Sequence, residues 1–123
     1  MPSDQETTVE QLRREIAAFI RERDWEQFHD PKNLSMAIAT EAAELMEHFQ
    51  WLTIEQSRAI PSQPEKLTEV SDELADILCY ALALANELQI DVAEAIRSKM
   101  VKNEQKYPAA EYRGRYGADD VQK

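Results

Sequence analysis

The sequence predicts an all-α fold, a four-helix antiparallel bundle. Only two of the 123 residues are glycine, so the tight turns that join β-strands are scarce. Apolar residues instead recur at intervals of three and four along four long segments, which is the spacing of helices that bury one face. Short connections between such helices favour antiparallel neighbours. A chain of this length is expected to form a single domain, residues 1–123, with its helical core over about 8–108.

The first helix is expected to begin near Thr8 and to end near Arg23. Capping-box spacing occurs twice at its start, from Thr7 to Glu10 and from Thr8 to Gln11. The apolar stripe that follows consists of Val9, Leu12, Ile16, Phe19 and Ile20. Residues 24–31 are rich in aromatics, lack helical periodicity and end at Pro31, so a structured loop is expected there.

The second helix is expected to run from an N-cap at Asn33 to about Trp51. Residues 52–64 form the connection, with Thr53 as the cap of one short turn. The third helix, about 65–89, is the most apolar part of the chain. We expect it to be the central helix, buried on more than one side.

Asp91 is the expected N-cap of the fourth helix, and Glu94 completes the capping box. This helix is expected to stop at Tyr107, before Pro108. Residues 109–123 are polar and contain both glycines, which predicts an extended or disordered tail. The third helix has more apolar surface than three partner helices would cover, so we also expect a homo-oligomer, a tetramer or a dimer.

Composition excludes several classes of function. A net charge of −10 argues against nucleic acid and anionic membrane as partners. No Gly-rich loop is present to hold phosphate, and no apolar run or leader predicts a membrane span or a signal peptide. The single cysteine, Cys79, lies in an apolar helical run and is expected to be buried and reduced, which fits the cytoplasm.

Two acidic pairs are the strongest chemical signal. Glu41 and Glu44 lie on the second predicted helix, and Glu73 and Asp76 lie on the third. Each pair is spaced i, i+3, so its carboxylates share one helix face at the edge of an apolar stripe. A carboxylate in that position is costly unless something compensates its charge. Four carboxylates without cysteine or histidine suit Mg²⁺, or Mn²⁺, rather than zinc.

The same acidic residues are also compatible with a solvated surface or with a di-iron site. With 24 acidic residues in the chain, i, i+3 pairs also arise by chance on solvated faces. A di-iron bundle needs Glu-x-x-His on two helices, and that pattern occurs once, from Glu26 to His29 in the predicted loop. His48 lies four residues after Glu44 and is either a neighbour on the surface or a ligand. Magnesium is favoured over iron.

Several residues near these pairs are candidates for binding an organic ligand. Trp25 and Trp51 are either core residues or platforms on which a flat base stacks. Tyr80 lies four residues after Asp76 and could hydrogen-bond a ligand on the same face. A polar stripe on the fourth helix is either solvent-facing or a phosphate clamp; it consists of Lys99, Asn103 and Lys106.

These motifs together resemble a known family. Glu-x-x-Glu followed by Glu-x-x-Asp on the next helix resembles the all-α nucleoside triphosphate pyrophosphohydrolases of the MazG-like superfamily. The segments Arg23–His29, Pro31–Leu34, Phe49–Trp51, Asp76–Tyr80 and Ser98–Pro108 resemble its dCTP pyrophosphatase branch. The resemblance covers roughly residues 8–108. Ile16 departs from it, because animal members carry a histidine there, so the base preference does not follow from the motifs.

The resemblance implies a Mg²⁺-dependent hydrolase that converts dCTP, or a modified dCTP, to the monophosphate and pyrophosphate in the cytoplasm. Glu41, Glu44, Glu73 and Asp76 would bind the metal, and Glu41 or Glu44 would accept a proton from the attacking water. The substrate-binding residues would be Trp25, Glu26, Gln27, Phe28, His29, Trp51, Tyr80, Lys99, Asn103 and Lys106. The alternatives are a non-catalytic helical module that binds metal or nucleotide, and a pyrophosphohydrolase for another nucleotide such as dUTP or phosphoribosyl-ATP.

Overall fold

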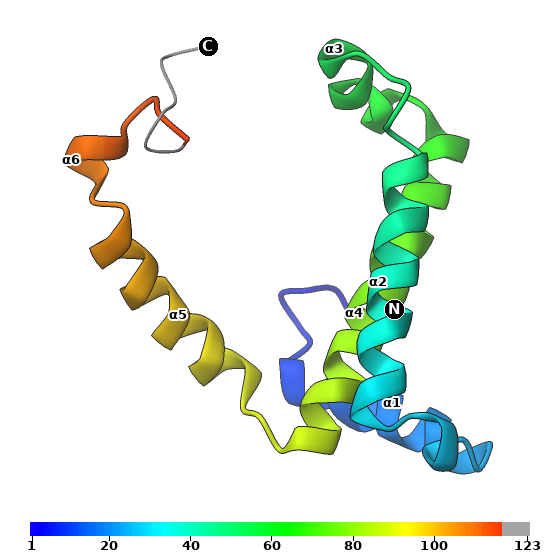
Figure 1. Ribbon diagram of the computed structural model, residues 1–123. Coiled ribbons are helices and arrows are strands. Elements are labelled where there is room, and N and C mark those ends of the chain that lie inside the picture. Colours follow the sequence, from blue (N-terminus) through cyan, green and yellow to red (C-terminus); the bar gives the residue numbers. More distant parts are fainter. Residues whose placement is uncertain (117–123) are drawn as a thin grey trace. The chain divides into compact units, whose positions relative to one another are not determined.

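The computed structural model describes residues 1–116, and no β-strand occurs among them, so the all-α prediction is confirmed. The chain divides into two compact units, Met1–Ile90 and the segment from Asp91 onward. The first unit contains α1 (Val9–Glu22), the 3-10 turn η1 (Glu26–Phe28), α2 (Pro31–Glu47), α3 (Ile54–Arg58), the 3-10 turn η2 (Ile60–Ser62) and α4 (Pro64–Leu88) (Figure 1). The second contains α5 (Val92–Lys106) and α6 (Ala109–Tyr112).

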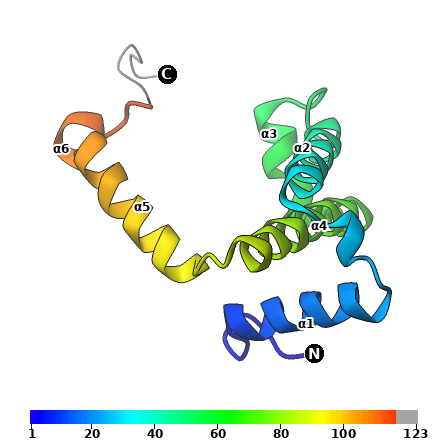
Figure 2. The same ribbon diagram turned by 60° about the horizontal axis from the view of Figure 1, so that its bottom comes forward.

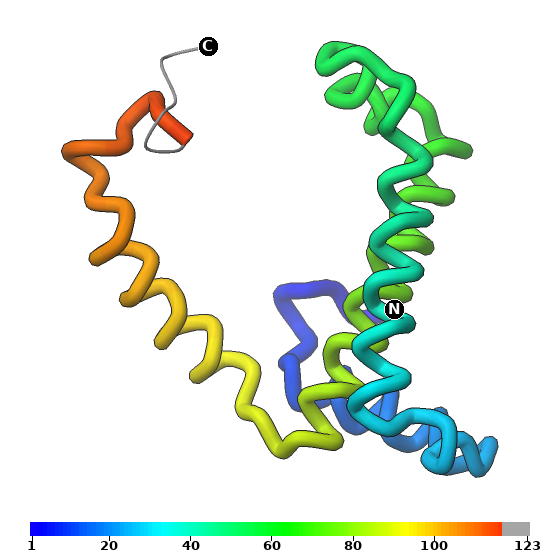
Figure 3. The backbone as a smooth tube through the Cα atoms, in the orientation of Figure 1, coloured from blue at the N-terminus to red at the C-terminus, as the bar shows by residue number. Residues whose placement is uncertain are grey.

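The first unit is built around an antiparallel pair of long helices. α2 and α4 lie side by side and run in opposite directions, as the backbone traces show (Figures 1 and 3). Leu34, in the first turn of α2, is 1% exposed, and Ile60, in the turn before α4, is 4% exposed. Ala83 and Ala85 are the other buried residues. The pairing places one face of α2 opposite one face of α4 over most of the length of α2, which is what brings their acidic residues together.

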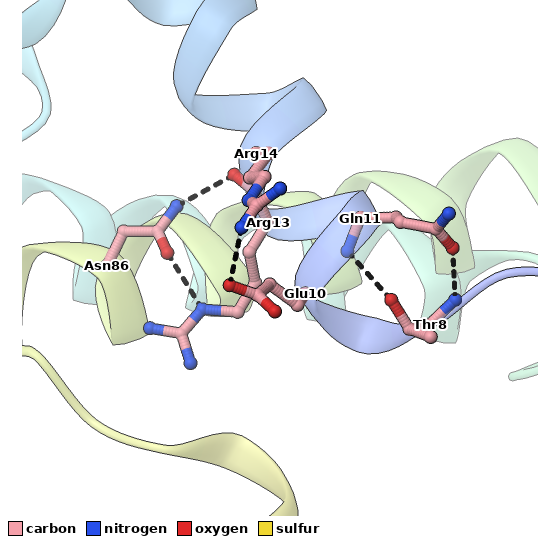
Figure 4. Close-up of polar contacts among 6 residues, drawn as sticks. All are labelled: Thr8, Glu10, Gln11, Arg13, Arg14 and Asn86. Carbon is pink, nitrogen blue, oxygen red and sulfur yellow. Dashed lines mark hydrogen bonds and ion pairs between the residues drawn. The ribbon is translucent and has the colours of Figure 1, made fainter.

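α1 lies beside the C-terminal half of α4 (Figure 2). Of the two predicted capping boxes the second forms, because the Thr8 hydroxyl accepts from the Gln11 backbone N–H and the Gln11 side chain accepts from the Thr8 N–H. Two reciprocal hydrogen bonds then join α1 to α4 (Figure 4): Arg13 Nε donates to Asn86 Oδ1 at 2.8 Å, and Asn86 Nδ2 donates to the Arg13 carbonyl at 3.1 Å. The first bond joins two side chains and the second joins a side chain to the backbone, and both connect residues 73 positions apart in sequence, so they fix one turn of α1 against α4.

The end of α1 turns the chain sharply at Asp24, which has a positive φ of 53°. The Trp25 N–H bonds the Ile20 carbonyl at 3.0 Å, and the Asp24 N–H bonds the Arg21 carbonyl at 3.0 Å. This is a Schellman motif, in which the left-handed residue is usually glycine and here is aspartate. Its consequence is that Trp25 folds back toward the last turns of α1.

The second helix begins earlier than predicted. The N-cap is Asp30, whose carboxylate accepts from the Asn33 backbone N–H at 2.9 Å, and Pro31 occupies the first helical position. Asn33 is therefore inside the helix rather than at its cap, because a proline is favoured at the first position, where its missing N–H costs nothing. The helix ends at Glu47, not near Trp51. The predicted cap at Thr53 is confirmed.

Two predictions about the second unit need correction. Asp91 caps α5 by accepting from the Glu94 N–H, but Glu94 does not return a bond to the cap. Residues 109–112 of the predicted tail form a helical turn, in which Tyr112 packs edge-on against Tyr107 with ring centroids 5.2 Å apart. Residues 117–123 of that tail lie outside the described part of the chain.

α4 is less buried than predicted. Only Ala83 and Ala85 are fully buried on it, whereas Leu74 and Leu78 are 48% and 52% exposed. The expectation that this helix is buried on more than one side is therefore wrong for the described contacts of one chain. Among residues 1–116, no helix combines the length and apolarity needed to cross a bilayer.

Candidate functional site

An acidic cluster lies where α2 faces α4. Glu41 on α2 and Glu73 and Asp76 on α4 each place a carboxylate oxygen within 4.8 Å of the others. Glu41 and Glu73 are half-buried, and Asp76 is exposed. Helical periodicity explains the arrangement, since Glu73 and Asp76 are one turn apart on the face that α2 covers. The structure therefore brings together three of the four carboxylates that the sequence singled out.

The crowding of these carboxylates changes their ionisation. Hydrogen bonding to Glu73, burial, and the neighbouring Glu44 carboxylate together raise the pKa of Glu41 from 4.5 to about 7. Glu44 is therefore within reach of Glu41, although it is exposed and does not belong to the tight group of three. Of the ion pairs formed within residues 1–116, none involves a member of this cluster. Within residues 1–116, the negative charge of the cluster is thus not compensated by an ion pair to a lysine or an arginine.

Two atoms of the cluster are suited to a cation. Glu41 Oε2 and Glu73 Oε2 are buried, and when both carboxylates are ionised neither of these oxygens has a hydrogen-bond donor among the described residues. Buried oxygens without partners are unfavourable, because they lose water and gain nothing in return. A hard divalent cation prefers carboxylate oxygens and would supply the missing interaction. The residues present therefore fit such an ion.

A pocket of about 380 Å³ adjoins the cluster, and Asp76 belongs to both. α1 and α4 form its walls, and the loop between α1 and α2 closes it with Trp25 and His29. Its lining residues are Glu15, Ile16, Phe19, Ile20, Trp25, His29, Asp76, Cys79, Tyr80 and Ala83. The volume and the mostly apolar lining are typical of sites for small organic molecules.

Aromatic rings form a stacked series in this pocket. The Trp25 and His29 rings are 6.1 Å apart between centroids and nearly parallel at 6°, and His29 is 6.3 Å from Tyr80 at 27°. His29 Nδ1 lies 2.9 Å from the Trp25 carbonyl, to which it donates, so Nε2 is the acceptor of the neutral ring. Rings ordered in this way offer a flat surface on which an aromatic ligand can stack.

Tyr80 and Cys79 also line the pocket, and both follow Asp76 of the acidic cluster within about one turn of α4. Burial, followed by the charges of Glu41 and Asp76, raises the pKa of Tyr80, so its hydroxyl keeps its proton. Burial and the Asp76 charge likewise raise the pKa of the Cys79 thiol. Cys79 is nevertheless exposed and lines the pocket. The expectation that it is a buried core residue is wrong, because the face of α4 that carries it meets a pocket rather than another helix.

The rest of the Trp25–His29 segment is placed differently. Glu26 lines a smaller cavity of about 90 Å³ together with His29. The Gln27 side chain donates to the Asp24 carbonyl at 3.1 Å, and Phe28 is 59% exposed while its carbonyl accepts from Asn33. Neither Gln27 nor Phe28 lines the larger pocket.

Trp51 is 87% exposed and does not line the pocket either. It follows the C-terminal end of α2, whereas Trp25 and His29 precede its N-terminal end. Seventeen helical residues separate the two ends, which is about 25 Å at 1.5 Å per residue. One chain therefore cannot bring both tryptophans to one base.

Two further candidate groups lie away from the cluster or in the other unit. His48 Nδ1 is 3.0 Å from Lys66 Nζ and 3.9 Å from Glu69, so it contacts α4 there. The polar stripe on α5 belongs to the second unit. Within that unit Asn103 contacts the Met100 sulfur at 4.0 Å, Lys106 lies over the Tyr107 ring at 5.3 Å, and Lys99 is exposed.

Sequence reasoning did not single out Glu15, Phe19 or Ile20 as residues of the site. Their signal was visible but ambiguous, because Phe19 and Ile20 belong to the apolar stripe that was assigned to the core. The fold-back of Trp25 after α1 is what turns part of that stripe into a pocket wall.

Fold and site together define an all-helical protein in which an acidic cluster suited to a cation adjoins an aromatic pocket. The model of the MazG-like family matches residues 36–116, and the chain belongs to that family. It is 43% identical over 109 residues to dCTP pyrophosphatase 1 of Rattus norvegicus, covering 89% of this chain and 64% of the relative. Identity to dCTP pyrophosphatase 1 of Homo sapiens is 43% over 104 residues, covering 85% of this chain and 61% of the relative. The chain thus spans less than two thirds of the length of these relatives.

A solved structure shows the same fold. The crystal structure of a pyrophosphatase from Archaeoglobus fulgidus matches with a TM-score of 0.73 and 35% sequence identity. The match covers 88% of this chain and 99% of that chain. The resemblance inferred from the sequence motifs is therefore confirmed at the level of the family and of the fold.

Proposed function

We propose that the protein is a Mg²⁺-dependent nucleoside triphosphate pyrophosphohydrolase that converts dCTP, or a modified dCTP, to the monophosphate and pyrophosphate. The single observation that carries this proposal is the acidic cluster of Glu41, Glu73 and Asp76 beside a stacked aromatic pocket that shares Asp76. The names of the relatives from rat and human and of the archaeal pyrophosphatase support the reaction class and the substrate.

The roles of the chain's own residues follow from this arrangement. Trp25, His29 and Tyr80 hold the base by stacking, and the protonated Tyr80 hydroxyl donates a hydrogen bond to the substrate. Glu41, Glu73 and Asp76 hold Mg²⁺, with Mn²⁺ as the other candidate; when bound, the ion neutralises phosphate oxygens and lowers the pKa of water.

A proton acceptor is also needed for the water that attacks the α-phosphorus. Glu44 is adjacent to Glu41 but outside the group of three, so it is a candidate for this role as well as for a fourth ligand of the metal. Glu41 is the other candidate. Lys99, Asn103 and Lys106 are proposed to contact the phosphates from α5, and Glu26, Gln27 and Phe28 to complete the substrate site. The expected setting is the cytoplasm, where nucleotide pools are found.

We also propose that the chain forms a four-helix antiparallel bundle. The active protein is proposed to be a homo-oligomer, a tetramer or a dimer. Several large apolar side chains of α1, α2 and α4 are at least 39% exposed, among them Phe19, Met46, Leu67 and Leu78. Exposure on this scale favours a second copy as the cover. Trp51 would then contribute to the pocket of a neighbouring copy. Light scattering at micromolar concentration is expected to give a multiple of 14.2 kDa; a monomeric mass would contradict the oligomer.

A nucleotide panel tests the function. Purified protein is incubated with each dNTP, dUTP and phosphoribosyl-ATP in the presence of Mg²⁺, and release of pyrophosphate is compared with release of phosphate. We expect pyrophosphate release that requires Mg²⁺ and is fastest with dCTP or a modified dCTP. Thermal stabilisation by nucleotide without hydrolysis would support a non-catalytic binding module instead. Faster turnover of dUTP than of dCTP would indicate a pyrophosphohydrolase for another nucleotide.

A further inference from the structure

We propose that Glu15 determines base specificity, by accepting a hydrogen bond from the exocyclic amino group of the base. This role presupposes the pyrophosphohydrolase function proposed above and deepens it, because it selects cytosine nucleotides over uracil nucleotides. Glu15 lies on α1, outside the acidic cluster, and lines the pocket of about 380 Å³.

The surroundings of Glu15 set it apart from the other charged residues of α1. Six of the residues that line the same pocket have apolar or small side chains, and two of these six are the aromatic Phe19 and Trp25. Within residues 1–116, Glu15 has no hydrogen bond or ion pair, whereas Glu10 pairs with Arg14 at 3.0 Å and Glu22 with Arg23 at 3.8 Å. Glu15 is thus an exposed acceptor without a partner that lines a pocket with aromatic walls.

The position of Glu15 is fixed by the contact between α1 and α4. Arg13, two residues earlier, is held to Asn86 by the two reciprocal hydrogen bonds of 2.8 and 3.1 Å (Figure 4). This turn of α1 is therefore tied to the same helix that carries Asp76 and Tyr80. A carboxylate on a helix that is anchored in this way is positioned more precisely, and so discriminates better between ligands, than a carboxylate on a free loop.

Hydrogen-bond chemistry gives the direction of selection. An ionised carboxylate only accepts hydrogen bonds. Cytosine presents an amino group at its fourth ring position, and uracil presents a carbonyl oxygen there. Glu15 would therefore bond cytosine and repel uracil, whose oxygen would face another acceptor with neither hydrogen bond made.

The other polar groups of the pocket do not make this distinction. Asp76 belongs to the acidic cluster and is needed there. The Tyr80 hydroxyl both donates and accepts, so it can pair with either an amino group or a carbonyl. His29 uses Nδ1 on the Trp25 carbonyl, and its ring belongs to the stacked series. Glu15 is the lining residue that can only accept and has no other task.

The variant Glu15→Gln tests this role. The amide keeps the size of the side chain but can donate as well as accept, so it can pair with the uracil oxygen. We expect the ratio of kcat/KM for dCTP to kcat/KM for dUTP to fall about tenfold or more, mainly through KM. Glu22→Gln is the matched control, because Glu22 is exposed on the same helix and does not line the pocket. Its ratio should equal that of the wild type.

Each outcome decides one question. An unchanged ratio in Glu15→Gln, in an enzyme that hydrolyses dCTP, overturns the role of Glu15 and leaves the proposed function intact. A wild-type enzyme that hydrolyses dCTP and dUTP with equal kcat/KM also overturns the role of Glu15 and leaves the proposed pyrophosphohydrolase function intact. If the wild type hydrolyses no nucleotide, the proposed function is overturned. Quenching of tryptophan fluorescence by dCTP and dUTP then gives the two binding constants, and an equal binding ratio in wild type and Glu15→Gln would overturn the role of Glu15 as well.

Discussion

Replacing Glu73 with glutamine is expected to reduce pyrophosphate release from dCTP by about a thousandfold or more. The substitution removes one of three carboxylates whose oxygens lie within 4.8 Å of one another, and with it a buried oxygen that has no other partner. Binding of Mg²⁺ should weaken in parallel, which isothermal titration calorimetry measures without reference to turnover.

The same variant should be more stable than the wild type when no divalent cation is present. Glu73 raises the pKa of Glu41 most strongly through a hydrogen bond that favours the protonated acid, and it also adds a like charge. The glutamine amide removes that charge and can donate a hydrogen bond to the ionised Glu41 carboxylate. We expect the Tm of the metal-free protein to rise by a few degrees. Asp72→Asn is the control, because Asp72 is the exposed neighbour of Glu73 on α4 and lies outside the cluster. Full activity of Glu73→Gln, or loss of its fold, would contradict the assignment.

Binding of Mg²⁺ is expected to weaken by about fiftyfold when the pH is lowered from 7 to 5. The reason is that Glu41, whose pKa is raised from 4.5 to about 7, must lose its proton before it can hold the ion. Below that pKa each unit of pH costs about a factor of ten in apparent affinity, and above it the affinity should level off. Titration calorimetry at pH 5, 6, 7 and 8 measures this profile.

The free energy of unfolding of the metal-free protein should depend on pH in the opposite sense from Mg²⁺ binding, and should be larger at low pH. The folded chain holds the Glu41 proton more tightly than the unfolded chain, because the pKa is about 7 when folded and 4.5 when unfolded. Protonation of Glu41 therefore favours the fold, and its contribution is present below pH 4.5 and is lost as the pH rises to about 7. The free energy of unfolding in urea, compared between wild type and Glu41→Gln, measures this contribution. The stability of the wild type relative to Glu41→Gln should therefore fall as the pH rises from 4.5 to about 7. A relative stability that stays constant across this range, or that rises with pH, would contradict this expectation.

Much of the fold was readable from local signals. The caps at Thr8, Thr53 and Asp91 and the apolar periodicity predicted where α1, α3, α4 and α5 occur, because capping and amphipathicity depend on neighbours in sequence. The start of α2 was misplaced because two adjacent signals competed, a side chain able to cap at Asn33 and a proline at the first helical position after Asp30.

The candidate site was predictable only in part. Glu41, Glu73 and Asp76 were visible as i, i+3 pairs beside apolar stripes, and a pair of adjacent helices suffices to bring such pairs together. Glu15 and Cys79 gave no such signal, because an acidic residue on an amphipathic helix and a cysteine in an apolar run usually belong to a solvated face and to a core.

Local sequence patterns were enough to predict that the described residues are helical, which residues begin most of the helices, and which acidic side chains share a helix face. These properties depend on spacings of three and four residues. Only the tertiary structure decided that Glu41 meets Glu73 and Asp76, that Trp25 folds back over α1, and that Trp51 lies at the other end of α2. Those arrangements depend on how α1, α2 and α4 pack, and a contact such as Arg13 with Asn86 joins positions too far apart in the chain for any local pattern to reveal.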